Sequence, residues 1–383
     1  MKDINRSPYT KETELKLDIF KRCFREWFPV FLNANRKYTE RLYIYDLFAG
    51  SGTDADGKWG SPLWLLSEAR GEQKQYCTQI LNGKAPSIYF AFNELKTEKA
   101  KELEEKVQRF FSLCSMRDCA HNRCAFQVKQ NIFFRNDSFQ NIAKSQNFLS
   151  ILNNNKFAKF IVLDQYGIKQ ITPSIFLELT KAPKTDFIFF IASSFLRRFK
   201  ETEAIKRYFD ENKIKFDPSN PQLCHKDIAR YYKSLIPNNR EYYIHHFTIK
   251  KGTNYYGLIF GTGHSLGMEK FLKVCWDEDK LAGESNCNIE QDFEEGTLFY
   301  DGVHTNKVKK VQSELKNKIN LGEITNNRDG MKFVLSKGCL PKVYIEVIKE
   351  LLKQNKVQIS AGEEFNKHST NIHKIKIYNF KRV

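Results

Sequence analysis

The stretch Tyr43–Gly52, which reads Tyr-Ile-Tyr-Asp-Leu-Phe-Ala-Gly-Ser-Gly, decides the fold. Its first half is β-branched and aromatic, and this pattern predicts a short buried strand that ends at Asp46. Gly50 and Gly52 then form a turn that a ligand can approach closely, because glycine has no Cβ. Nucleotides bind where such a turn follows a strand at the carboxyl edge of a parallel sheet. The stretch therefore predicts an α/β fold, with an ordinary strand and turn as the alternative reading of the glycines.

An acid, an aromatic residue and two glycines occur in this turn at a defined spacing. Asp46, Phe48, Gly50 and Gly52 form the pattern Asp-x-Phe-x-Gly-x-Gly, which resembles the first signature of the S-adenosylmethionine (SAM)-dependent methyltransferases. The pattern has one glycine fewer than the dinucleotide fingerprint Gly-x-Gly-x-x-Gly, and an acid precedes the glycines. The resemblance implies a Rossmann-like class I methyltransferase sheet, in which these four residues line the SAM site.

A second motif follows the turn and makes the resemblance more specific. The run Gly60-Ser61-Pro62-Leu63 predicts a helix start, because serine caps helix amino termini and proline suits the first helical position. Together with the glycine turn, this run resembles the three-Cys-motif partner protein family. Its members are methyltransferase-like bacterial proteins encoded beside a radical-SAM protein with three cysteines. The resemblance covers residues 11–276 and implies a radical-SAM protein as partner.

Composition and charge favour a protein that binds polyanions, and they argue against a membrane-spanning or disulfide-rich secreted protein. The chain has 383 residues, with 62 Lys and Arg against 45 Asp and Glu and a formal net charge of +17. This charge favours polyanionic partners, so DNA or RNA is an expected ligand, and a Lys-rich proteome is the alternative explanation. No run of about 18 apolar residues occurs, which predicts that the chain does not span a membrane. The nine cysteines are too sparse for a secreted disulfide scaffold, so we expect a cytoplasmic protein.

Two acids follow the second and third predicted strands. Glu94 comes after the strand predicted over 87–92, and a carboxylate at this point can accept hydrogen bonds from the ribose hydroxyls of a nucleoside cofactor. Asp137 follows the strand predicted over 126–134, where, by resemblance, methyltransferases often bind the adenine amine. Each acid also has a purely structural explanation, because acids at helix starts interact favourably with the helix dipole or cap the helix.

The fourth predicted strand, over 157–163, ends in Asp164-Gln165-Tyr166-Gly167. In amino-methyltransferases this position carries an Asp or Asn with a Pro-Pro-Tyr run, which accepts hydrogen bonds from the target amine and stacks on the base. The resemblance therefore implies Asp164 and Tyr166 as catalytic residues. The partner family usually has proline where Gln165 stands, so the turn is less rigid here. A hydrogen-bonded strand-end turn without catalysis is the alternative.

A compact group of thiols lies between the second and third predicted strands. It consists of Cys114, Cys119, His121 and Cys124. Three thiols and one imidazole can complete a tetrahedral zinc shell, so zinc is a candidate cofactor. The spacing lacks a paired Cys-x-x-Cys framework, and unpaired cysteines in a variable insertion are the alternative.

The last part of the chain predicts a closing hairpin and a second unit. Strands over 242–250 and 255–260 form the hairpin, which resembles the antiparallel end of a methyltransferase sheet. We assign 1–276 to a methyltransferase-like SAM-binding domain, 277–330 to a linker or insertion and 331–383 to a small winged-helix-like domain. A short helix and a Lys-rich strand pair favour this last assignment, which implies docking of nucleic acid or protein. An appendage that only packs on the main domain is the alternative.

Two functions stay open. The first is SAM-dependent methyl transfer to an exocyclic amine of a nucleobase or a similar group, which the intact glycine turn and Glu94 favour. The second is a degenerate methyltransferase fold that serves as a binding or scaffold partner of the radical-SAM protein, for example in defence against phage, which Gln165 favours. In either case the basic stretch from Arg197 to Arg207 is an expected phosphate-binding face.

Overall fold

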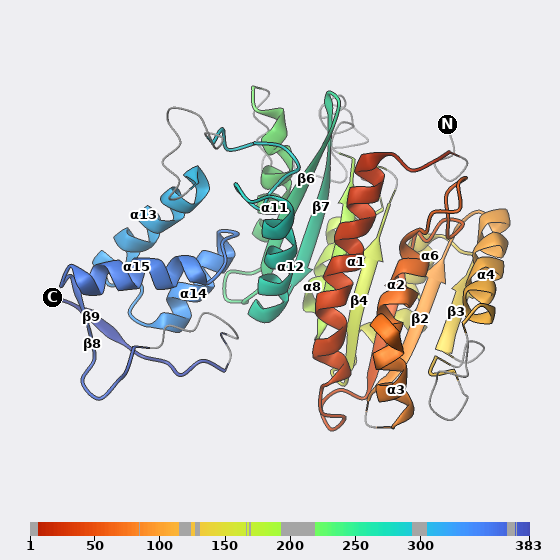
Figure 1. Ribbon diagram of the computed structural model, residues 1–383, viewed down its shortest axis with the longest axis horizontal. Coiled ribbons are helices and arrows are strands. Elements are labelled where there is room, and N and C mark those ends of the chain that lie inside the picture. The colour runs from red at the N-terminus through yellow and green to blue at the C-terminus, as the bar shows by residue number, and fades with distance from the viewer. Residues whose placement is uncertain are drawn as a thin grey trace.

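The computed structural model describes residues 7–83, 85–114, 124–126, 131–165, 167, 170–192, 219–292, 305–365, 372 and 374–383. A seven-stranded sheet with helices on both faces forms the larger part of the molecule (Figure 1). A group of three helices and a two-stranded sheet lies beside the β6 edge of that sheet.

The central sheet has the strand order β3-β2-β1-β4-β5-β7-β6. Its strands are β1 (Arg41–Asp46), β2 (Ser87–Asn93), β3 (Ile132–Arg135), β4 (Phe157–Leu163), β5 (Thr185–Ile191), β6 (Tyr243–Lys251) and β7 (Asn254–Thr262). The first five strands pair in parallel, and β7 joins β5 as part of an antiparallel hairpin with β6. The predicted Rossmann-like α/β fold and its closing hairpin are therefore confirmed. Because the chain order reverses between β1 and β4, their carboxyl ends form the switch point where such sheets bind ligands.

Helices cover both faces of the sheet. One face carries α1 (Lys11–Leu32), α2 (Ser61–Arg70), α3 (Gln75–Leu81), α4 (Thr97–Ser112) and α12 (Ser265–Glu278). The other carries α6 (Phe139–Lys144), α7 (Gln146–Leu152), α8 (Pro173–Lys181) and α11 (Cys224–Ser234). Short 3-10 helices span Glu72–Lys74 and Pro221–Leu223. Within the described ranges, no helix is long and apolar enough to cross a membrane.

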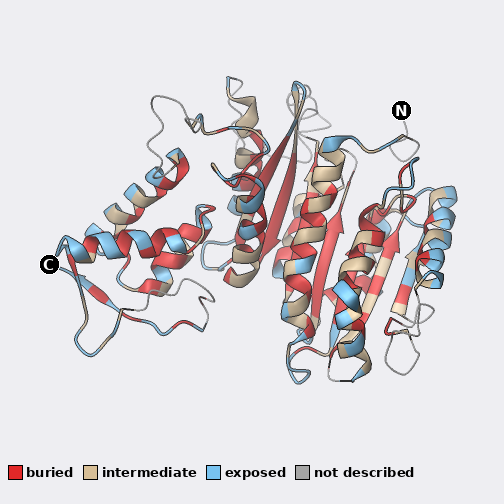
Figure 2. Ribbon diagram, in the orientation of Figure 1, coloured by how far each residue is buried: buried red, intermediate tan, exposed pale blue. Residues whose placement is uncertain are grey.

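The central strands are buried on both faces, as Figure 2 shows. In β4, Phe160 and Val162 face the core on the α1 side, whereas Ile161 and Leu163 face the core on the α8 side. This double burial explains why β4 is a continuous apolar run and does not alternate polar and apolar residues.

Two elements differ from their predicted bounds. The sequence predicts that Pro29 ends or kinks the first helix, and the structure shows that it does not end it: α1 continues to Leu32, which is buried and extends the apolar stripe beyond the proline. The third strand was expected from residue 126, but β3 begins at Ile132. Phe126 lies in a turn, where its buried ring packs 5.9 Å from the ring of Phe90, so burial and not strand pairing explains its apolar character.

The carboxyl-terminal part forms a unit of its own around α13 (Asn306–Asn320), α14 (Asn327–Ser336) and α15 (Lys342–Lys353). The three helices pack against one another, and β8 (Val357–Ile359) pairs antiparallel with β9 (Phe380–Arg382). Helix α13 lies in the expected linker, yet it packs with the two helices that follow. A hydrogen bond of 3.0 Å from Trp276 Nε1 in α12 to the carbonyl of Gly338 joins this unit to the main domain.

Candidate active site

The glycine turn after β1 lies against the loop after β2. Both glycines have a left-handed backbone, with φ of 63° at Gly50 and 85° at Gly52, a conformation that L side chains rarely adopt. The amide of Ala49 donates to the carbonyl of Asn93 at 2.8 Å. The amide of Gly50 donates to Glu94 Oε2 at 3.1 Å. The structure thus brings together the turn and the acid that the sequence selected separately.

Asn93 holds three loops of this edge together through a side chain that no sequence motif marks. Asn93 is buried, and its Nδ2 donates to the carbonyls of Leu47 at 3.2 Å and Asp137 at 3.0 Å. Its Oδ1 accepts from the amide of Asp137 at 3.2 Å. One amide side chain therefore fixes the loops after β1, β2 and β3 relative to one another.

The carboxylate of Asp137 is engaged by its own loop. Its Oδ1 accepts from the amide of Ser138 at 2.7 Å and from Asn141 Nδ2 at 2.8 Å. Ser138, and not Asp137, caps α6, because its hydroxyl accepts from the amide of Asn141 at 3.2 Å. Asp137 itself is exposed at the same edge of the sheet as the glycine turn.

Asp46 is the buried acid of the site. Its side chain has no exposed surface, Oδ1 accepts from the amide of Phe48 at 3.3 Å, and Oδ2 has no hydrogen-bond partner among the described residues. Burial raises the pKa of Asp46 to about 7, while a hydrogen bond with Ser61 opposes the rise. Asp164 raises this pKa further through its charge, which indicates that the acids after β1 and β4 lie close together.

The loop after the glycine turn is organised by Asp54. Its Oδ1 accepts from the amides of Asp56 at 3.0 Å and Lys58 at 2.8 Å. The chain then returns to the turn, where the amide of Gly60 donates to the carbonyl of Gly52 at 2.8 Å. The ring of Phe48 packs 5.2 Å from that of Phe139, so this predicted cofactor residue contributes to the apolar wall of the site.

The segment before α1 covers this loop, which the sequence did not indicate. The amide of Tyr9 donates to Asp54 Oδ2 at 2.7 Å, and the Tyr9 hydroxyl lies 3.1 Å from the position that a Cβ on Gly60 would occupy. Burial raises the pKa of Tyr9, and the charges of Asp54, Asp164 and Asp46 raise it further. Tyr9 therefore lies among the acids of the site and keeps its proton at neutral pH.

Asp164 stands at the end of β4 and forms an ion pair with α1. Lys16 Nζ donates to Asp164 Oδ1 at 2.8 Å and to Oδ2 at 2.6 Å. The same ammonium lies 4.6 Å from the ring centroid of Phe190, near the end of β5. The two side chains of the pair are 13% and 20% exposed. The predicted acceptor carboxylate is thus already bound by a lysine 148 residues away in the chain.

Gln165, the residue after Asp164, stabilises the turn through its side chain. Gln165 is 1% exposed, and its Oε1 accepts from the amide of Gln170 at 3.1 Å. Its Nε2 is buried and has no hydrogen-bond partner among the described residues. The glutamine therefore folds the loop with its side chain, where a proline would have restricted its backbone. Tyr166 lies outside the described residues, and its stacking role stays a prediction.

The candidate zinc cluster is only partly described. Cys114 follows α4 and Cys124 precedes a turn, and both are half-buried with free thiols. Cys119 and His121 lie outside the described residues. The described residues contain no group of three or more metal-ligating side chains, so zinc binding stays a prediction. The basic stretch from Arg197 to Arg207 also lies outside them.

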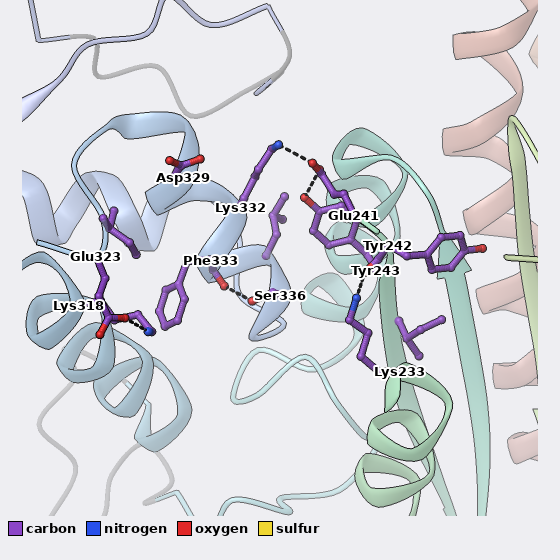
Figure 3. Close-up of a pocket in the computed structure, with 13 residues that line it drawn as sticks. Lys233, Glu241, Tyr242, Tyr243, Lys318, Glu323, Asp329, Lys332, Phe333 and Ser336 are labelled. Atoms are coloured by element: carbon purple, nitrogen blue, oxygen red, sulfur yellow. Dashed lines mark hydrogen bonds and ion pairs between the residues drawn. The ribbon is translucent and has the colours of Figure 1, made fainter. Parts of the chain in front are cut away.

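A cavity of about 410 Å³ lies far from the glycine turn, between β6 and the carboxyl-terminal helices (Figure 3). Tyr243 at its wall pairs with Thr262, which pairs with Asp186 at the start of β5. The cavity therefore opens at the amino-terminal edge of the parallel strands, away from the switch point. Lys332 and Tyr243 both bind Glu241, at 2.6 and 2.7 Å. These three side chains already pair with one another across the cavity. We therefore interpret the cavity as part of the contact between the main domain and the carboxyl-terminal unit.

Comparisons with known proteins give a likeness to methyltransferases. No protein-family model matches the chain, and neither does any curated protein. The chain is similar to an O-methyltransferase from Bacillus cereus in complex with SAH, at 14% identity and a TM-score of 0.31, over 66% of this chain and 91% of that one. It is also similar to a precorrin-6y C5,15-methyltransferase from Geobacter metallireducens, at 10% identity and a TM-score of 0.29, over 68% of this chain and 94% of that one. With scores this low, the fold assignment rests on strand order and register.

Proposed function

We propose that this protein is a SAM-dependent methyltransferase whose cofactor binds at the switch point between β1 and β4. The observation that carries the proposal is the hydrogen bond from the amide of Gly50 to Glu94. It joins a left-handed glycine turn to a carboxylate at the carboxyl edge of a parallel sheet, where nucleoside cofactors bind in such folds. The strand order and the antiparallel β6–β7 hairpin agree with the methyltransferase resemblance of the sequence.

The residues at this edge fit the chemistry of SAM. The carboxylate of Glu94 would accept hydrogen bonds from the ribose hydroxyls. The left-handed turn at Gly50 and Gly52 lets the cofactor approach the backbone, since no Cβ projects there. Asp137 supplies a carboxylate at the same edge for the adenine amine of the cofactor. Asp46, whose pKa burial raises to about 7, would lie near the positively charged part of the cofactor, and that charge would favour its ionised form. SAM supplies an activated methyl group, so the task of the protein is to position donor and acceptor.

Asp164 is the proposed acceptor-binding group. Its place at the end of β4, beside the end of β1, is where the resemblance puts the residue that binds a target amine. A carboxylate there would accept a hydrogen bond from the amine and orient its lone pair toward the methyl group. Tyr166 would then stack on an acceptor base. An exocyclic amine of a nucleobase is the acceptor that this pair fits best, and the net charge of +17 favours a nucleic acid as its carrier.

A second candidate function is binding without methyl transfer. One observation favours it: both oxygens of Asp164 are bound by Lys16, so the acceptor carboxylate already has a charged partner in this conformation. In that case the protein would keep the methyltransferase fold as a scaffold for a radical-SAM partner, in a setting such as defence against phage. The carboxyl-terminal unit, with three helices before a strand pair, would be a winged-helix-like docking module in either function.

Calorimetry with SAM tests the proposal. We expect the wild type to bind SAM, and Gly50→Val to lose binding, because a β-branched side chain is strained at positive φ and fills the turn. Gly57→Val is the matched control, since Gly57 also has a positive φ but an added Cβ would meet nothing within 4 Å. No SAM binding by the wild type, or equal binding by all three proteins, would exclude the SAM site.

Methyl transfer separates the two candidate functions. Wild-type protein is incubated with labelled SAM and with DNA or RNA, and label in the nucleic acid is counted. Transfer that Asp164→Ala abolishes, while SAM binding persists, supports the enzyme. SAM binding with no transfer to either polymer favours the scaffold.

A further inference from the structure

Lys16, Asp164 and Phe190 form a corner that binds a cation. The three residues come from α1, the end of β4 and β5, and they meet at the carboxyl edge of the sheet. The ammonium of Lys16 donates to both carboxylate oxygens and lies 4.6 Å from the ring centroid of Phe190. The ring of Phe190 is fixed in turn by stacking on Tyr256, with centroids 5.7 Å apart. A carboxylate beside the face of an aromatic ring is a recognised arrangement for holding ammonium groups.

The corner is therefore chemically suited to a protonated amine, but the chain fills it with its own. Because Lys16 is attached to α1, its ammonium competes with free amines as an intramolecular ligand at high effective concentration. The pair is mostly shielded from water, so its attraction is weakened less by salt than that of a surface pair. A second ammonium entering the corner would face the charge of Lys16 at a carboxylate that is already neutralised.

We propose that Lys16 is a specificity-determining residue, which closes this corner to protonated alkyl amines and leaves it open to neutral amines. A carboxylate offers about four acceptor positions, and Lys16 uses one on each oxygen. A neutral N–H group can take a remaining position without bringing a second positive charge. Aromatic amines such as those of nucleobases are neutral at pH 7, whereas lysine side chains and polyamines are not. The identification of the corner with the acceptor site rests on the proposed function; the exclusion of alkylammonium ions does not.

The test uses n-butylammonium, which has the length and charge of a lysine side chain. Its binding is measured by NMR titration of wild type, Lys16→Met and Lys16→Gln. We expect saturable binding to Lys16→Met, at least about tenfold tighter than any binding to the wild type, because methionine leaves the carboxylate and the ring without a cation. Asp164→Asn in the Lys16→Met background should remove that binding. If Lys16→Met does not fold, Lys16→Gln replaces it in the titration, because glutamine removes the positive charge and keeps a neutral donor for Asp164.

Lys21→Met is the matched control. Lys21 lies on the same helix, 4.3 Å from the ring centroid of Trp64, but its carboxylate partner Asp18 is 3.6 Å away and more exposed. We expect this variant to behave like the wild type. Equal binding of n-butylammonium by wild type and Lys16→Met would overturn the proposal, and so would no binding by both folded Lys16 variants. SAM calorimetry on the same samples keeps the two questions apart, because absence of SAM binding contradicts the proposed function and leaves the butylammonium result unaffected.

Discussion

Glu94 Oε2 accepts a hydrogen bond of 3.1 Å from the backbone amide of Gly50, so the acid after β2 and the glycine turn after β1 are held together before any ligand arrives. The other oxygen of Glu94 accepts from the amide of Lys96 at 2.9 Å. Two backbone amides thus fix the orientation of this carboxylate. A ribose that binds there meets an acceptor whose position is already set, which lowers the entropic cost of binding.

Glu94→Gln is expected to weaken SAM binding more than it weakens the fold. The amide oxygen of glutamine can still accept from Gly50, but it cannot accept two ribose hydroxyls as a charged carboxylate does. Hydrogen bonds to charged groups contribute about 1.5–3 kcal/mol, so we expect affinity to fall by about tenfold to a hundredfold. Calorimetry with SAM measures this. Glu104→Gln, on the exposed side of α4, is the control, and equal affinities for both variants would contradict a ribose-binding role.

Gly52→Ala and Gly57→Ala separate backbone strain from side-chain contact. Both glycines have a positive φ, of 85° and 78°, and alanine there costs about 1–2 kcal/mol. A Cβ on Gly52 would also lie 3.0 Å from Leu103 Cδ1, which is buried, whereas a Cβ on Gly57 would meet nothing within 4 Å. We therefore expect Gly52→Ala to lose more stability in chemical denaturation and to weaken SAM binding. Indistinguishable denaturation midpoints for the two variants would contradict the contact with Leu103.

The sheet and its switch point were predictable from the sequence because their signals are local. A buried strand that runs into a glycine turn identified β1, and the continuous apolar run of β4 reflects its burial on both faces. The acids Asp46, Glu94 and Asp164 were selected because each ends a predicted strand or follows one within two residues. Parallel strands then place such residues at one edge without any knowledge of the packing.

The residues that complete the site were not predictable, because their partners are distant in sequence. Lys16 binds Asp164 across 148 positions, and Tyr9 binds Asp54 across 45. Nothing in the composition of α1 distinguishes Lys16 from the other basic residues of that helix. Asn93 was visible as a strand-end residue, but its bonds to Leu47 and Asp137 depend on how three loops meet. The radical-SAM partner and the binding of nucleic acid stay predictions.

A buried ion pair fastens the carboxyl-terminal unit to the main domain. Lys307 in α13 lies 2.7 Å from Glu284 Oε1 and donates to the carbonyl of Ala282 at 2.6 Å, with both side chains of the pair at most 5% exposed. Lys307→Met leaves Glu284 buried with less compensation, so we expect a loss of about 3–5 kcal/mol in the free energy of unfolding.

The exposed pair of Lys316 and Glu350, 2.7 Å apart, is the control for Lys307→Met. Lys316→Met should lower the free energy of unfolding by at most about 1 kcal/mol, because two exposed charges are already well hydrated and their pairing adds little stability. Chemical denaturation measures both variants. Similar losses of stability in the two would show that the pair of Lys307 and Glu284 does not fasten the unit.

Asp46 makes the protein less stable as the pH rises. Burial raises its pKa from 3.8 to about 7, so between these values the folded protein binds a proton that the unfolded chain has lost. Stability then falls with pH across this window, by about 3 kcal/mol for this group between pH 5 and pH 8. Burial raises the pKa of Asp186 to about 6. This group also lowers the stability as the pH rises, but its contribution ends near pH 6. Asp46→Asn has no proton to lose, so urea denaturation should show a smaller fall than in wild type, with the difference building up steadily between about pH 4 and pH 7. Parallel stability curves for wild type and Asp46→Asn across that range would contradict a neutral, buried Asp46 in the folded protein.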